Sequence, residues 1–444
     1  MMRKPMILES LNEVGVSSSH NDQVLLKLLR RKVVGQTINF KKGLFRINHK
    51  DRVSHNIHKF PAKLIHHIPY FFIRNNAMSS VGDTVLDLFC GSGTVLVEAM
   101  LAGRNCIGAD INPLCRLIAK VKTTRLDKDE LQFGIQKLFT TLREEVKMRA
   151  PNFPNIDYWF TKCSQLSLTK IKWAIDMGDF SGDIRNFFYV CLSSIIRKSS
   201  KADPRISPPV FSKCMRKKVN EGRRVYPIKY FKQEVMKNSK RISKFSSLCF
   251  ENCESQILSN DARRLSLKNE SVDFVITSPP YMSAQKYFRS TRLELFWLGL
   301  VDEEELLKLD SRLIGTERIR SSEYSQVRRT CISEADELIE KIYKIDRLRA
   351  SIVARYFTDL RLVFKEIFRC LKNGKYFVLV IGNNEVRGFK IPSHIIVSKL
   401  GEETGFRQEL ALVDEIKSRG LMTKRNKTAG IINSEWILAF KKEM

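Results

Sequence analysis

The stretch that decides the fold is residues 84–94, which read Thr-Val-Leu-Asp-Leu-Phe-Cys-Gly-Ser-Gly-Thr. Its apolar first half predicts a short buried strand, and the glycines that follow predict a turn. Residues 95–102 predict an apolar helix that ends at Gly103, and residues 105–110 predict a second strand. A strand, a turn, a helix and a strand in this order form a βαβ unit, which indicates a parallel sheet.

Further strands of the same kind follow later in the chain. A helix is predicted over residues 356–371 and is capped by residues 372–374, Lys-Asn-Gly. The last two strands are separated by a polar loop and predict a terminal hairpin. The strands predicted after the first two are residues 255–261, 272–278, 376–382, 410–416 and 435–441. Seven strands in this arrangement predict an open, mostly parallel α/β sheet with helices on both faces and an antiparallel edge.

The chain is strongly basic. Its 444 residues include 77 Lys and Arg against 48 Asp and Glu, which gives a net charge of +29. Such an excess indicates a polyanionic partner, either nucleic acid or a membrane face. The membrane is excluded because no stretch reaches about 18 consecutive apolar residues, and the N-terminus is a poor signal peptide. The ten Cys are scattered without a zinc pattern, so we expect free thiols in a reducing cytoplasm.

Nearly half of the excess charge lies in residues 197–244, which hold 16 Lys and Arg against three acids. Aromatic residues alternate with these charges, and prolines interrupt regular structure. This composition favours contact with a nucleic-acid backbone and stacking on bases, and the alternative is a solvated face. The predicted contacts are Arg205, Arg216, Lys217, Lys218, Arg223 and Arg224 in this segment, with Arg425 and Lys427 in the last loop.

The glycine loop is of a kind that binds nucleotides, and three cofactors compete for it. A dinucleotide site requires a glycine three residues after Gly93, where Leu96 stands, and a P-loop requires a lysine that is absent. Asp87, near the end of the first strand, would repel phosphate and attract an ammonium group. Asp110 ends the next strand and would accept from ribose hydroxyls. Ammonium and ribose without phosphate describe S-adenosylmethionine (SAM), and a loop without any ligand is the alternative.

Ser278, Pro279, Pro280 and Tyr281 form a turn at the end of the strand predicted over residues 272–278. The two prolines fix the backbone and leave rigid carbonyl groups at the sheet edge where open α/β folds bind ligands. Ser278 Oγ and the Pro279 carbonyl would accept from the two N–H groups of an exocyclic base amine and free its lone pair for attack on a sulfonium methyl. Tyr281 would stack on a base swung out of the helix. A surface turn without function is the alternative.

Together these residues resemble the amino-methylating DNA methyltransferases, the N4-cytosine/N6-adenine family of restriction-modification type. The family's SAM loop is similar to residues 87–94, and its catalytic tetrapeptide is similar to residues 278–281. Residues 55–63, His-Asn-Ile-His-Lys-Phe-Pro-Ala-Lys, resemble the family segment that packs over the methionine end of the cofactor. The resemblance implies the class I SAM-dependent methyltransferase fold, SAM as the cofactor, double-stranded DNA as the partner and no metal.

The resemblance also implies roles for particular residues. The expected catalytic residues are Ser278, Pro279, Pro280 and Tyr281. Asp261, which ends the third strand, would accept from the adenine amino group of the cofactor. The full set of expected cofactor-binding residues is Phe60, Pro61, Asp87, Phe89, Gly91, Ser92, Gly93, Thr94, Asp110, Asn112 and Asp261.

The chain then divides into five predicted parts. They are an N-terminal segment with the SAM-binding half (1–124), a basic insert and candidate target-recognition region (125–253), the start of the catalytic half (254–282), a second helical insert (283–350) and the C-terminal part of the catalytic sheet (351–444). We expect both inserts to be mainly helical.

The target base follows from the tetrapeptide. In this family the Ser form goes mostly with cytosine N4, and the Asn and Asp forms go with adenine N6. N4 enzymes often place the catalytic turn before the SAM loop, and this chain has the opposite order, so adenine N6 stays an alternative. An RNA amino-methyltransferase and a non-catalytic DNA-binding module are further alternatives. The expected protein is a site-specific N4-cytosine DNA methyltransferase in the cytoplasm of a bacterium or archaeon, near the nucleoid, with a cognate restriction endonuclease encoded nearby as a candidate partner.

Overall fold

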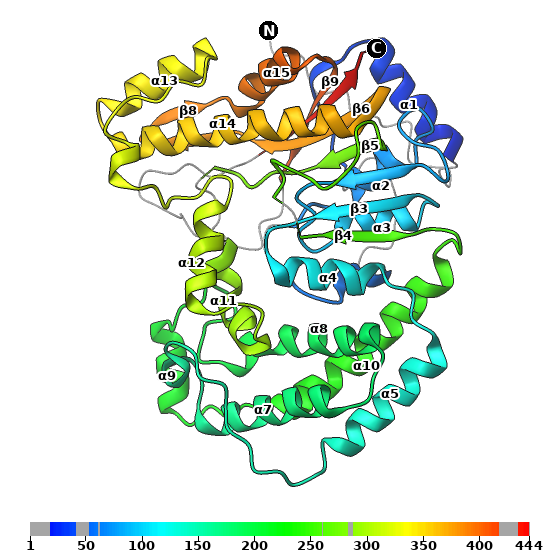
Figure 1. The fold of residues 1–444 in the computed structure, drawn as a ribbon, viewed down its shortest axis with the longest axis vertical. Helices are drawn as coiled ribbons and strands as arrows, with labels where there is room; N and C mark the ends of the chain where they lie inside the picture. The colour runs from blue at the N-terminus through cyan, green and yellow to red at the C-terminus, as the bar shows by residue number, and fades with distance from the viewer. Residues whose placement is uncertain are drawn as a thin grey trace.

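A computed structural model describes residues 18–40, 53–60, 63–259, 261–282, 287–416 and 434–443. Within these ranges eight strands form one sheet in the order β1-β9-β10-β6-β5-β2-β3-β4 (Figure 1). All neighbouring strands are parallel except β10, which runs antiparallel to both β6 and β9. The strands are β1 Val34–Thr37, β2 Thr84–Asp87, β3 Asn105–Ala109, β4 Ser255–Leu258, β5 Val272–Thr277, β6 Leu371–Gly382, β9 Phe406–Glu415 and β10 Ser434–Lys442.

All seven predicted strands are confirmed, and the count of seven is wrong by one. The eighth strand is β1, which pairs in parallel with β9 at the edge of the sheet. Its four residues, Val-Gly-Gln-Thr, show no apolar periodicity that would predict a strand. They are exposed or half-buried, and they form a strand because they pair with β9. The predicted cap at residues 372–374 is also wrong. Leu371 pairs with Val272 directly after the helix, so these residues lie inside β6, with Gly374 at φ +74°.

Side chains point alternately to the two faces of the sheet along each strand, and both faces are buried in apolar clusters. In β6, Val378 and Val380 belong to one apolar cluster, whereas Phe377 and Leu379 belong to another. The first face is covered by α1 Ser18–Arg30, α2 His67–Ile73, α3 Thr94–Met100 and α4 Pro113–Thr123. The second face is covered by α13 Ser333–Tyr343, α14 Arg347–Cys370 and α15 Ser393–Thr404. The expected helices on both faces are therefore present.

A layer of helices continues the first face and fills the lower part of Figure 1. There α8 contacts α4, α7, α10 and α11, and its apolar side chains join the same cluster as α3 and α4. The members are α5 Lys128–Thr141, α6 Ile156–Trp159, α7 Lys162–Met177, α8 Gly182–Ser199, α9 Lys213–Asn220, α10 Pro227–Leu248 and α11 Tyr287–Leu298. The remaining elements are α12 Glu303–Arg312, the 3₁₀ turns η2 Val53–Asn56 and η3 Ser321–Glu323, and a hairpin of β7 Asn384–Val386 and β8 Phe389–Ile391. Among the residues described, no helix is long and apolar enough to cross a membrane.

Candidate active site

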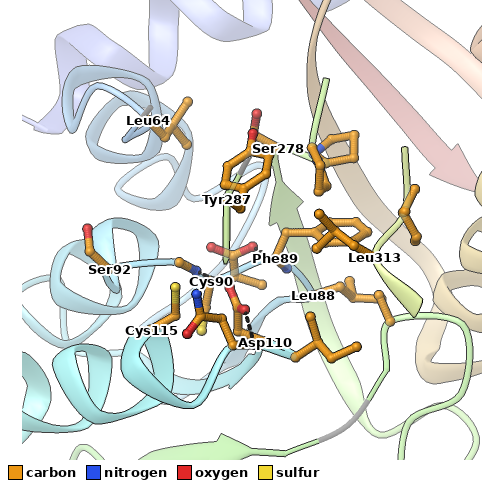
Figure 2. A pocket seen from close by; sticks show the side chains of 18 of the residues that line it. Leu64, Leu88, Phe89, Cys90, Ser92, Asp110, Cys115, Ser278, Tyr287 and Leu313 are labelled. Atoms are coloured by element: carbon orange, nitrogen blue, oxygen red, sulfur yellow. Dashed lines mark hydrogen bonds between the residues drawn. The ribbon is translucent and has the colours of Figure 1, made fainter. Parts of the chain in front are cut away.

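A cavity of roughly 1260 Å³, measured with the solvent at its mouth, lies at the carboxyl ends of β2, β3 and β5. Open α/β sheets bind ligands at this edge. Figure 2 shows Ser278 and Tyr287 on the side of β5 and α11, and Ser92 and Asp110 on the side of the glycine loop and β3. The predicted site residues that line it are Phe60, Asp87, Phe89, Gly91, Ser92, Thr94, Asp110, Asn112, Asp261, Ser278, Pro279, Pro280 and Tyr281.

The glycine loop turns the chain from β2 into α3 through two left-handed residues. Gly91 has φ +47° and Gly93 has φ +77°, and Gly93 is the residue before the first turn of α3. A Cβ atom on Gly93 would lie 3.0 Å from the Cα of Ala119 on α4. Gly93 therefore allows two helices to approach closely, and it does not itself line the cavity.

Two carboxyl groups, the buried Asp87 and the half-buried Asp110, hold the loop in place. Asp87 accepts from Thr277 Oγ1 at 2.5 Å and from the Phe89 amide at 3.1 Å. Asp110 accepts from the amides of Gly91 at 2.9 Å and Asn112 at 2.8 Å. Burial raises the pKa of Asp87 to about 7, against the hydrogen bonds from Thr277 and Phe89, which lower it. Burial also raises the pKa of Asp110. An ammonium group beside Asp87 would stabilise its charged form.

The turn after β5 lies opposite the glycine loop. Thr277, the last residue of β5, ties the turn to Asp87 through its hydroxyl. The Tyr281 hydroxyl donates to Glu435 Oε1 at 2.7 Å. Burial, followed by the charge of Glu435, raises the pKa of the Tyr281 phenol well above its ordinary value. The tetrapeptide and the loop therefore face one cavity, although about 190 residues separate them in the sequence.

Several predicted cofactor residues also have partners within the fold. Asn112 is the N-cap of α4 and accepts from the Leu114 amide at 3.0 Å. Asp261 is paired with Arg263, with Nη2 2.6 Å from Oδ2, and this pairing outweighs burial and lowers the pKa of Asp261. The cofactor roles of these two residues stay predictions. Pro61 lies outside the described residues.

The cavity suits a cationic nucleoside. Its floor carries the carboxyls of Asp87 and Asp110, and its walls are largely apolar. Ser92 Oγ is buried and has no hydrogen-bond partner within the described part of the chain, so it can serve a ligand hydroxyl. Lys63 is a cation in the wall, and its Nζ donates to the His55 carbonyl at 3.0 Å. These groups fit a ligand with an ammonium, a carboxylate and a ribose.

Several residues of the cavity wall were not among the predicted site residues, and three of them carry polar groups that matter for the chemistry. Tyr287 begins α11, Arg312 ends α12 and Glu435 lies near the start of β10. No motif marks Tyr287 or Arg312. A signal did exist for Glu435, because the first residues of an antiparallel strand lie at the carboxyl edge of its parallel neighbours.

The predicted nucleic-acid contacts differ in how far the fold engages them. Arg205 pairs with the buried Asp203 at 2.8 Å. Arg223 donates to the carbonyls of Ser200 and Lys198, at 2.9 and 3.0 Å. By contrast, Arg216, Lys217 and Lys218 of α9 and Arg224 in the turn after it are exposed. Arg425 and Lys427 lie outside the described residues.

Comparison with known proteins identifies relatives of the whole chain. Residues 28–120 match the family model of the N6/N4 DNA methylases. The Type II methyltransferase M.MvaI of Kocuria varians is 27% identical over 95% of this chain and 97% of its own. M.BsoBI of Geobacillus stearothermophilus, also a Type II methyltransferase, is 24% identical over 74% of both chains. A solved SAM-dependent methyltransferase of Methanosarcina mazei aligns over 83% of this chain and 96% of its own, at 11% identity and a TM-score of 0.30.

The strand order and the cavity define the class: an open, mostly parallel sheet with one antiparallel strand inserted near its edge, as expected of the class I SAM-dependent methyltransferases. Within that class, the match of residues 28–120 and the similarity to Type II methyltransferases agree with the resemblance to the amino-methylating DNA methyltransferases that the sequence indicated. These similarities agree with SAM as the cofactor that the sequence predicts.

Proposed function

We propose that the chain transfers a methyl group to the exocyclic N4 of cytosine within a short specific sequence of duplex DNA, as the modification enzyme of a restriction-modification system. The observation that carries the proposal is the position of Ser278–Tyr281 opposite the glycine loop, in one cavity at the carboxyl edge of the sheet. The Ser form of the tetrapeptide supports cytosine over adenine. A cytoplasmic location in a bacterium or archaeon belongs to the same proposal.

The proposed cofactor site uses the two carboxyl groups that hold the loop. The Asp87 carboxylate would hold the ammonium group of SAM, and Asp110 would accept from the ribose hydroxyls. Phe60 and Phe89 would pack on its apolar parts. The cofactor supplies an electrophilic methyl group on a sulfonium, so the protein has to position and activate the nucleophile.

The proposed catalytic step is carried by the turn after β5. Ser278 Oγ and the Pro279 carbonyl would accept the two N–H groups of the cytosine amine, which pulls the nitrogen out of conjugation with the ring and exposes its lone pair. Pro279 and Pro280 hold this geometry because their φ angles are fixed. The target base has to leave the stack to reach the cavity, so base flipping is part of the proposal.

The basic residues of the helical layer would bind the DNA backbone. In Figure 1, α9 lies at the left of this layer, below α11 and α12, which contribute Tyr287 and Arg312 to the cavity wall. The exposed Arg216, Lys217 and Lys218 of α9 would contact the backbone of a duplex that approaches the cavity from this side. Backbone contacts of this kind position a duplex without reading its sequence.

The test is a methylation reaction followed by nucleoside analysis. Purified protein, SAM and mixed duplex DNA should yield N4-methylcytosine by mass spectrometry. A yield of N6-methyladenine alone would overturn the base assignment, and methylation of tRNA in preference to duplex DNA would favour an RNA enzyme. If no nucleic acid is methylated, the activity itself is refuted. Methylation-sensitive sequencing of a host that expresses the gene would then give the recognition site.

A further inference from the structure

A half-buried acid from the last strand reaches the catalytic turn. Glu435, at the start of β10, pairs across the sheet with Gly382, the last residue of β6. Its Oε1 accepts from the Tyr281 hydroxyl at 2.7 Å. Ser278 lines the same cavity as Tyr281 and Glu435, and its hydroxyl lowers the pKa of the Tyr281 phenol. The bond between Tyr281 and Glu435 is therefore one link of a path that would begin at the catalytic serine.

The surroundings of Glu435 raise the pKa of its carboxyl group. Burial raises the pKa of Glu435, and the hydrogen bond from Tyr281 lowers it in part. Asp414 of β9 pairs opposite Glu435 in the sheet, and burial, with the charge of Glu435 adding to it, raises the pKa of Asp414 to about 6. The charge of Tyr287, the first residue of α11, also raises the pKa of Tyr281.

The proposed reaction leaves a surplus proton on the target amine, and a base has to accept it. When the amine nitrogen bonds to the methyl carbon, the carbon–sulfur bond breaks and the nitrogen still carries a surplus proton. The nearest protein acceptor of the amine hydrogens would be Ser278 Oγ. A serine hydroxyl is far too weak a base to keep that proton alone, but it can pass one on through a hydrogen bond.

Resting on the proposed function, we propose that Glu435 is the terminal acceptor of the proton that the target amine loses, reached through Ser278 and Tyr281. The amine proton moves to Ser278 Oγ, the serine proton moves to Tyr281 Oη, and the phenol proton moves to Glu435 Oε1. The carboxylate ends as a neutral acid, and both hydroxyl groups are restored. Glu435 acts through Tyr281 and is therefore a positioning residue that also stores the proton.

The charges favour this route in a largely apolar cavity. Before transfer the site holds a positive sulfonium and a negative Glu435, and after transfer it holds neither charge. A proton left on the base amine would instead remain as an isolated charge in a largely apolar cavity, which is costly. The raised proton affinity of Glu435 suits a general base, because it brings the acid closer to the working pH.

The experiment measures the single-turnover rate of methyl transfer to duplex DNA against pH, in wild type and in Glu435→Gln. Glutamine still accepts from Tyr281 but cannot take the proton. We expect the rate to fall by roughly 10²–10⁴-fold, with unchanged affinities for SAM and DNA, and the acidic limb of the pH profile to disappear. Tyr281→Phe keeps the ring and breaks the chain, so it should show the same loss of rate.

The matched control is Asp414→Asn, which removes the neighbouring buried acid but keeps an acceptor for the Phe40 amide, now 3.1 Å from Asp414 Oδ1. This variant should keep the plateau rate and move the acidic limb to lower pH. If Glu435→Gln and Tyr281→Phe bind SAM and methylate with the wild-type rate and profile, the relay is refuted while the proposed function stands. Wild-type protein that methylates no DNA would overturn both.

Discussion

Replacing Lys217 and Lys218 of α9 by glutamine should make DNA binding less sensitive to salt. Both side chains are exposed, and Lys217 has only a loose ion pair with Glu221, at 3.7 Å. Exposed pairs of this kind contribute at most about 1 kcal/mol to stability, so the fold should not change. Each phosphate contact adds about 0.9 to the slope of log affinity against log salt, so the double variant should lose about 1.8.

The assay is fluorescence anisotropy of a labelled duplex, titrated with protein at several salt concentrations. Between about 50 and 200 mM salt, a slope difference of about 1.8 means that the wild type loses about twelvefold more affinity than the variant. The matched control replaces Lys268 and Lys365 by glutamine and removes the same charge. Lys268 lies in the turn before β5, and Lys365 lies on the last turns of α14. Both are exposed toward the amino edge of the sheet, away from the cavity.

The control separates a local contact from a general effect of charge. Equal reductions of the slope in both double variants would show that net charge alone governs binding. An unchanged slope in the α9 variant would refute the assignment of this helix to the DNA backbone.

Three further predictions concern the cavity itself. Gly93→Ala should destabilise the protein by about 2–4 kcal/mol, because the new Cβ sits on a left-handed residue and clashes with Ala119 Cα. Gly91→Ala should cost only about 1 kcal/mol, because its Cβ would have open space. Urea unfolding compares the free energies of the two variants. Asp87 should release a proton when the ammonium group of SAM binds. The affinity for SAM, measured by calorimetry, should therefore rise by up to about tenfold per pH unit as the pH approaches the Asp87 pKa of about 7. Asp87→Asn should bind SAM weakly and without this rise. A rise of the same size in Asp87→Asn would contradict that role. Ser278→Ala should abolish methyl transfer and leave SAM binding within about twofold, since the serine would contact only the base; a wild-type rate would contradict its place in the site.

Local sequence signals were enough for the parts of the fold that are short and continuous. The apolar runs gave seven strands and the glycine loop, because buried strands and tight turns have strong residue preferences. The edge strand β1 escaped because its four residues have no preference of their own and depend on β9 for their pairing. The start of β6 was misread because pairing with β5 outweighs the local tendency of Lys-Asn-Gly to form a turn.

The sequence by itself was enough to predict which residues meet at the cavity. Asp87, Asp110 and Ser278 could be placed at one edge of the sheet because parallel strands end on the same side. Only the tertiary structure decided what joins them. Strand β10 lies between β6 and β9, which carries Glu435 to Tyr281 across 154 positions of sequence. The order of strands in a sheet depends on how whole faces pack, and no short motif records it.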